Sequence, residues 1–187
     1  MVEPFEENSS KEGGEIYLDS AVVVQGSGDE GDEGDSGKYK KVVCGGTFDH
    51  LHYGHRRLLT VALACTSGKG TLTIGVSGEG LLGDKKGGRI EDVGVRRKKV
   101  EEFMARLSPG MRNNVRLTTL DTPYGSTVVE RDVEAVVLSS ETVRGGREIN
   151  KIRKGMGWEE CDLIVATRGN AGGMSSTGVR RRIMGKG

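Results

Sequence analysis

The sequence has few of the residues that mark a membrane protein, a disulfide-bonded scaffold or a base-stacking surface. Aromatic residues make up 4% of the 187 positions, which leaves few rings on which nucleic-acid bases could stack. No apolar run reaches the roughly 18 residues of a transmembrane helix, and the acidic N-terminus does not resemble a signal peptide. Cys44, Cys65 and Cys161 are odd in number and widely spaced, which predicts buried thiols in a reducing compartment. We therefore expect a cytoplasmic protein.

Charge is distributed unevenly along the chain, although the whole sequence carries a formal charge of only +1. Residues 1–37 contain eleven acidic residues and one basic residue, Lys11, so this segment carries −10 and the remainder carries +11. Residues 26–37 are all Gly, Asp, Glu or Ser, and cannot bury enough apolar surface to offset the entropy of ordering. We therefore predict a flexible, disordered acidic N-terminal arm, residues 1–37, and a basic domain, residues 38–187, that suits an anionic ligand.

Short apolar segments alternate with helical patterns from residue 39 onward. Strands are predicted at residues 41–44, 71–76, 115–120, 135–138 and 162–166, and helices at residues 55–63, 92–107, 148–154 and 176–184. This alternation predicts an α/β fold, a doubly wound parallel five-stranded sheet with helices on both faces. Ligands of such sheets bind at the carboxyl ends of the strands. Within the arm, residues 16–18 and 21–24 could add a short strand or a docked segment.

All three histidines of the chain fall within six residues, between the first strand and the first helix of the predicted domain. Gly45 and Gly46 precede them and would let the backbone approach a ligand closely. His52 and His55 are three residues apart at the start of the helix, where free N–H groups attract a phosphate. We predict that this pair binds a phosphate and that His50 is structural. A zinc site is the rival, but no carboxylate or thiol at ligand spacing completes it.

A second phosphate-binding pattern lies near the C-terminus. Ser175, Ser176 and Thr177 form a natural N-cap cluster ahead of the last predicted helix. Arg180 follows within one turn and could reach a phosphate held at that helix N-terminus.

The two patterns together resemble the nucleotidyltransferase superfamily that includes the class I aminoacyl-tRNA synthetases. More closely, residues 45–59 (GGTFDHLHYGHRRLL), 122–125 (TPYG) and 139–153 (SSETVRGGREINKIR) resemble the eukaryotic and archaeal type of phosphopantetheine adenylyltransferase. The resemblance covers roughly residues 40–183. It implies a Rossmann-like fold and the transfer of an adenylyl group from ATP to 4'-phosphopantetheine, giving dephospho-coenzyme A and pyrophosphate, with magnesium (Mg2+).

The resemblance also implies roles for individual residues. Thr47 and Phe48, beside Gly46, would contact the nucleotide and the phosphopantetheine phosphate, and His52 and His55 would stabilise the α-phosphate. The β- and γ-phosphates would be held by Ser175, Ser176, Thr177 and Arg180. Either Lys85 or Lys86 would supply the lysine of the loop after the second strand, and Asn150 and Arg153 match the family pattern of ligand-binding positions better than Arg144 does.

Because the attacking group is itself a phosphate with a second pKa of about 6, the reaction needs no general base. The protein would position the reactants and neutralise the growing charge. Two alternatives stay open: a different enzyme with the same motif, such as a cytidylyltransferase or a nicotinamide mononucleotide adenylyltransferase, and a non-catalytic module that binds nucleotide or nucleic acid. We expect small-molecule substrates and neither a nucleic-acid nor a membrane partner, and the sequence leaves the oligomeric state open.

Overall fold

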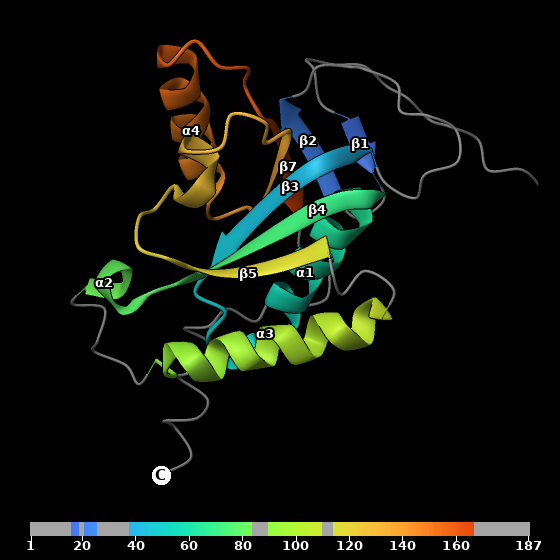
Figure 1. Cartoon of the computed structure of the whole chain (residues 1–187), viewed down its shortest axis with the longest axis vertical. Coiled ribbons are helices and arrows are strands. Elements are labelled where there is room, and N and C mark those ends of the chain that lie inside the picture. The colour runs from blue at the N-terminus through green and yellow to red at the C-terminus, as the bar shows by residue number, and fades with distance from the viewer. Residues whose placement is uncertain (1–15, 19–20, 26–37, 84–89, 110–113, 167–187) are drawn as a thin grey trace, which may run out of the picture.

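The computed structural model describes residues 16–18, 21–25, 38–83, 90–109 and 114–166 (Figure 1). Its centre is a sheet of five parallel strands in the order β7-β6-β3-β4-β5. These strands are β3 (Tyr39–Gly46), β4 (Thr66–Ser77), β5 (Val115–Leu120), β6 (Ala135–Ser139) and β7 (Asp162–Ala166). The prediction of an α/β fold around a five-stranded parallel sheet is confirmed.

Two short strands from the acidic N-terminal segment extend this sheet to seven strands. β2 (Ala21–Gln25) pairs with β7 in the antiparallel sense, and β1 (Ile16–Leu18) pairs with β2 in the same sense. β2 covers the edge of β7, whose N–H and C=O groups would otherwise be unpaired on that side. The sheet therefore includes residues on both sides of the domain boundary expected at residue 37.

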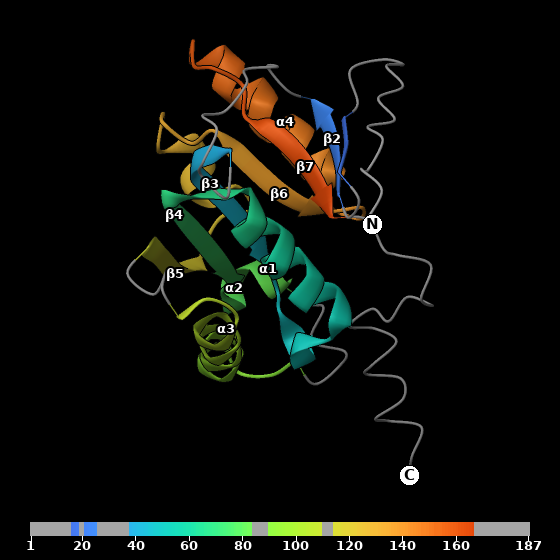
Figure 2. The same ribbon diagram turned by 90° about the vertical axis from the view of Figure 1, so that its right-hand side faces the viewer.

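Helices cover both faces of the sheet (Figures 1 and 2). The longer ones are α1 (Tyr53–Cys65), α3 (Val93–Leu107) and α4 (Val143–Gly155), and the short ones are η1 (Asp49–Leu51), α2 (Glu79–Leu82) and η4 (Gly125–Val128). α1 and α3 contact each other and pack on one face, whereas α4 packs against β6 and β7 on the other. In the part of the chain that the structure describes, no helix has the length and apolarity needed to cross a bilayer.

Alternation along the strands divides the core between the two faces, because successive side chains of a strand point to opposite sides. Val42 and Cys44 join the cluster under α1 and α3, and Val43 joins the cluster under α4. α4 begins five residues before the predicted start of its helix. Gly145 and Gly146 weaken the helical pattern there, but a Cβ on Gly146 would lie only 2.4 Å from Leu138 Cδ1, so close packing on β6 requires that glycine.

Glycines at the carboxyl edge of the sheet make room for one leucine. A Cβ on Gly75 would lie 2.5 Å from Leu120 Cδ2, and a Cβ on Gly125 would lie 2.6 Å from the same atom. A Cβ on Gly45 would lie 3.1 Å from Leu120 Cδ1. Space for a ligand was the expected reason for Gly45, whereas the structure gives it a packing reason. A Cβ on Gly46 would come no closer than 3.5 Å to the Phe48 ring, an ordinary contact.

Candidate active site

The segment between β3 and α1 makes a tight turn at the carboxyl edge of the sheet. Phe48 and His50 both adopt the left-handed backbone conformation, each with φ of 53°. This region costs a residue other than glycine about 1–3 kcal/mol, so the surrounding contacts must hold it in place. Phe48 is fully buried, and its carbonyl accepts a hydrogen bond of 3.3 Å from Leu51 N–H. The turn thereby places His52 at the N-cap of α1, directly before Tyr53.

His52 caps the N-terminus of α1 with its side chain. Gly54 N–H donates to His52 Nδ1 over 3.1 Å. Because Nδ1 accepts this bond, a neutral His52 carries its proton on Nε2. The cap therefore fixes the tautomer of His52 and gives the ring an N–H donor at Nε2, beside the N–H groups of the helix start.

His55 lies one turn further along α1 and stacks on His52, with ring centroids 3.8 Å apart and ring planes at 21°. The Phe48 ring meets His55 edge-on at 5.3 Å. Burial, together with the charge of His52, lowers the pKa of His55 to about 3. Its Nδ1 atom is buried and has no hydrogen-bond partner among the residues that the structure describes. His55 is therefore neutral at physiological pH in the ligand-free protein.

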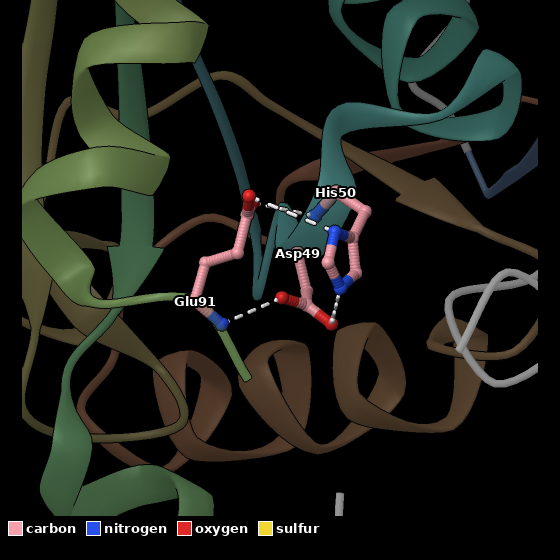
Figure 3. Close-up of side chains that lie close together, drawn as sticks. All are labelled: Asp49, His50 and Glu91. Carbon is pink, nitrogen blue, oxygen red and sulfur yellow. Dashed lines mark hydrogen bonds and ion pairs between the residues drawn. The ribbon is translucent and has the colours of Figure 1, made fainter. Parts of the chain in front are cut away.

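Asp49, His50 and Glu91 form a cluster that joins this turn to the residues ahead of α3 (Figure 3). Glu91 N–H donates to Asp49 Oδ1 over 2.9 Å, and His50 N–H donates to Glu91 Oε2 over the same distance. The His50 ring lies 3.6 Å from Glu91 Oε1 and 3.8 Å from Asp49 Oδ2. Lys99 on α3 forms an ion pair with Glu91. The cluster therefore ties two segments together that are about 40 residues apart in the chain.

Ligand atoms of this cluster lie within 4.8 Å of one another, close enough to suggest a metal. The sequence analysis disfavoured a zinc site because no carboxylate lies at ligand spacing from the histidines. Glu91 lies 41 positions after His50, so a motif search could not associate the two residues. Burial raises the pKa of Glu91, but the Lys99 ammonium and His50 N–H outweigh it, so the net pKa is lowered. Lys99 thus already supplies the positive charge that a metal would bring. We therefore assign the cluster a structural role, in which it holds the histidine turn against the segment that precedes α3.

Arg96 reaches from α3 to the ends of two strands. Its side chain is fully buried, and Nη1 donates to the carbonyls of Thr47 and Ser77 over 2.7 and 2.9 Å. Nε donates to the Glu91 carbonyl over 2.8 Å. The sequence analysis missed this residue. The available signal was an arginine four residues before Val100 and eight before Met104, on the buried face of an amphipathic helix.

Asn150 and Arg153 do not fit the ligand-binding role expected from the family resemblance. Arg153 is fully buried, and all five of its N–H donors bind backbone carbonyls. Those carbonyls belong to Thr127, Glu130, Arg131, Val133 and Glu159. Asn150 donates to the Cys161 carbonyl and accepts from Cys161 N–H. Both side chains therefore hold α4 to the loops beside it and leave no donor of Arg153 for a phosphate.

The remaining predicted site residues divide between the described turn and other parts of the chain. Gly46, Thr47 and Phe48 come together with His52 and His55 at the carboxyl edge of β3. Lys85, Lys86, Ser175, Ser176, Thr177 and Arg180 lie outside the described residues, as does the helix predicted at 176–184.

The three cysteines are buried thiols, as predicted. Burial raises the pKa of Cys44 to about 12 and that of Cys65 to about 11. Burial also raises the pKa of Cys161 to about 11. The thiolate is the reactive form, so these side chains take no part in the chemistry of the site.

A family model described as cytidylyltransferase-like matches residues 43–182 of the chain. The chain belongs to the cytidylyltransferase-like family. The match begins in β3 and includes the histidine turn, so the predicted nucleotidyltransferase identity is confirmed. In this structure the histidine pair follows β3 at the carboxyl edge of the parallel sheet, the edge at which such sheets bind ligands.

Individual relatives agree with this family. Proteins named phosphopantetheine adenylyltransferase from Methanothermobacter thermautotrophicus and Methanopyrus kandleri are 40% and 33% identical to the chain, over 147 and 128 residues. These matches cover 77% and 68% of this chain, and 85% and 78% of the relatives. A Saccharomyces cerevisiae protein of the same name is 38% identical, over 64% of this chain and 39% of its own length. The crystal structure of an Archaeoglobus fulgidus protein of unknown function superposes with a TM-score of 0.58 at 25% identity, covering 72% of this chain and 94% of that one.

Proposed function

We propose that the chain transfers the adenylyl group of ATP to 4'-phosphopantetheine, releasing pyrophosphate and forming dephospho-coenzyme A. The observation that carries this proposal is the stacked pair His52 and His55 at the N-terminus of α1, beside the end of β3. That geometry suits a phosphate, because helix N-H groups and imidazole donors converge there. The acceptor is inferred from the relatives, several of which are named phosphopantetheine adenylyltransferase.

In the proposed reaction an oxygen of the phosphopantetheine phosphate attacks the α-phosphorus of ATP. The new P–O bond forms as the bond from the α-phosphorus to the bridging oxygen breaks, and the departing electrons leave with pyrophosphate. The attacking phosphate is already mostly ionised near pH 7 because its second pKa is about 6. The protein therefore contributes in-line positioning and charge stabilisation and needs no general base.

His52 and His55 would act as hydrogen-bond donors to the α-phosphate. His52 offers Nε2–H because its Nδ1 accepts from Gly54 N–H. His55 starts neutral in its buried position, and an anion beside it would raise its pKa again, since opposite charge favours the protonated ring. Thr47 and Phe48 occupy the preceding turn, within reach of the same edge of the sheet, and we propose that they contact nucleotide and acceptor phosphate.

Magnesium would enter with ATP, held by phosphate oxygens, and would supply positive charge to the polyphosphate. Within the described ranges, the cluster Asp49, His50 and Glu91 does not fit it as a protein site. One of the three donors is an imidazole nitrogen, whereas magnesium prefers oxygen, and Glu91 is already paired with Lys99. No step of the proposed reaction depends on that cluster.

The proposal assigns the β- and γ-phosphates to Ser175, Ser176, Thr177 and Arg180, and the loop lysine to Lys85 or Lys86. These assignments rest on the family pattern. The buried thiols agree with a reducing compartment, and we propose that the enzyme works in the cytoplasm on small molecules, without nucleic-acid or membrane partners.

The family description favours one further candidate, cytidylyl transfer. A panel that measures pyrophosphate release separates the two. ATP and CTP are each offered with 4'-phosphopantetheine, and ATP is also offered with nicotinamide mononucleotide. The proposal expects release with ATP and 4'-phosphopantetheine at a kcat/KM at least about a hundredfold above the other pairs. Preference for CTP, or for nicotinamide mononucleotide, would replace the proposed substrates.

A further inference from the structure

We propose that Arg96 is a positioning residue for the transfer reaction. It fixes the main chain where β3 and β4 end, and this main chain holds the turn that carries Thr47 and Phe48. The role in the reaction rests on the proposed function. The effect on the turn does not, because it concerns the protein without substrate.

Arg96 acts at the point where the pairing of the two central strands stops. The last paired residues of β3 and β4 are Gly46 and Val76. The next carbonyl on each strand belongs to Thr47 and Ser77, and both accept a hydrogen bond from Arg96 Nη1. One guanidinium therefore joins the two strand ends one residue beyond their last pair, at the edge of the sheet where ligands bind.

The same guanidinium also holds the segment that leads into α3. Arg96 Nε donates to the Glu91 carbonyl, while Glu91 N–H binds Asp49 on the turn and His50 N–H binds the Glu91 carboxylate (Figure 3). The turn is thus fastened to this segment from two sides, through Arg96 at Thr47 and through Glu91 at Asp49 and His50.

Packing alone does not account for a charge at position 96. Val100 and Met104 continue the same buried face of α3, so an apolar side chain would extend that face without removing a cation from water. Burying a cation is costly unless it is hydrogen-bonded and matched by opposite charge. Burial lowers the pKa of Arg96, and the Asp49 carboxylate, itself fully buried, opposes that shift. The charged side chain is therefore explained by its three carbonyl acceptors, because its hydrogen bonds to them fix the main chain of three segments.

The fixed backbone has a direct consequence for the turn. A trans peptide holds its C=O and N–H in opposite directions. Binding the Thr47 carbonyl to Arg96 therefore directs Phe48 N–H away from the guanidinium and fixes the peptide that precedes the left-handed conformation of Phe48. Loss of this bond would let the peptide rotate and displace the residues that the proposed function places against the substrates.

The test compares Arg96→Lys with Arg97→Lys. Arg97 is the next residue of α3, and it donates to Thr119 and the Leu117 carbonyl at β5, away from the turn. A lysine at 96 keeps the charge but not the planar fork that reaches carbonyls on three segments. Hydrogen exchange without substrate should be at least about tenfold faster at the amides of His50, Leu51 and Glu91 in Arg96→Lys than in Arg97→Lys. With ATP and 4'-phosphopantetheine, kcat should fall about 10- to 100-fold and KM for ATP should change less than about threefold.

Exchange rates at those amides that match in the two variants, with equal kcat, would overturn the proposal. A lower melting temperature alone would then mark Arg96 as a packing residue. Arg96→Gln, which retains a planar amide donor, serves as the second variant and should show the same two effects. Failure of both Arg96 variants to fold, while Arg97→Lys folds, would also overturn a role confined to positioning. If the unaltered protein forms no dephospho-coenzyme A, the proposed function fails, and the exchange comparison still decides whether Arg96 holds the turn.

Discussion

The imidazole rings of His52 and His55 stack with their centroids 3.8 Å apart, and the His52 side chain also caps the helix that carries His55. Two protonated rings at that distance would repel each other, and burial already keeps His55 neutral, with its pKa lowered to about 3. We propose that an anion binds beside the pair and supplies the negative charge that would stabilise a protonated ring. Four measurements test parts of this account.

Replacing His55 by alanine should remove most of the activity and leave the protein folded. The ring offers a donor where charge grows on the α-phosphate, and loss of one such donor lowers kcat by on the order of 100-fold. Turnover of ATP with 4'-phosphopantetheine and the circular dichroism spectrum give the two readouts. His50→Asn is the control, because asparagine tolerates the left-handed conformation of that residue. Normal turnover in a folded His55→Ala protein would refute the assignment.

Stability should depend on pH through His55. Its folded pKa of about 3 lies below the ordinary value of 6.5, so between these values the unfolded chain binds a proton that the folded chain does not. The stability that comes from this difference is present above pH 6.5 and is lost as the pH falls toward 3, with a slope of at most about 1.4 kcal/mol per pH unit. The free energy of unfolding in urea is measured from pH 4 to pH 8 for the protein and for His55→Gln. Plotted against pH, the two curves should differ by that slope below pH 6.5 and run parallel above it. Parallel curves would contradict the lowered pKa.

Arg153→Lys should destabilise the protein without weakening substrate binding. Lysine has three donors, so at least two of the five carbonyls bound by Arg153 would lose their partner, each at a cost of about 1–3 kcal/mol. Chemical denaturation should therefore give a loss of at least about 2 kcal/mol, while KM values for ATP and 4'-phosphopantetheine stay the same. Lys151→Arg, on the exposed face of α4, is the control. A stable variant with raised KM would restore the phosphate-binding role of Arg153.

Gly146→Ala should lower stability, whereas Gly145→Ala should not. A Cβ at Gly146 would meet Leu138 Cδ1 at 2.4 Å and Leu163 Cδ2 at 3.1 Å, whereas a Cβ at Gly145 meets nothing within 4 Å. Overpacking at 146 should cost about 1–3 kcal/mol. At 145 the better helix propensity of alanine should leave stability unchanged or raise it by up to about 1 kcal/mol. Equal melting temperatures for the two variants would mean that α4 is not packed on the sheet in this way.

Local patterns predicted the five parallel strands and the position of the histidines, because both depend on residues close together in the chain. The strands at residues 115–120 and 162–166 have the predicted bounds, and the histidine pair lies at the start of α1 as expected, with His52 as the N-cap. Contacts between segments that are distant in the chain produce no local sequence pattern from which they could be predicted. Glu91 meets Asp49 across 42 positions, and Arg96 meets Thr47 across 49. The motif resemblance assigned a ligand-binding role to Arg153. A motif does not indicate which polar side chains form their hydrogen bonds with the protein's own backbone, as Arg153 does.

The most direct test of the central claim is the product itself. The purified chain is incubated with ATP, magnesium and 4'-phosphopantetheine, and the mixture is analysed by mass spectrometry, with His55→Ala in parallel. We expect dephospho-coenzyme A and pyrophosphate in equal amounts, and on the order of 100-fold less of both with His55→Ala. Absence of dephospho-coenzyme A from the reaction of the folded, unaltered protein, or equal amounts from both proteins, would contradict this expectation.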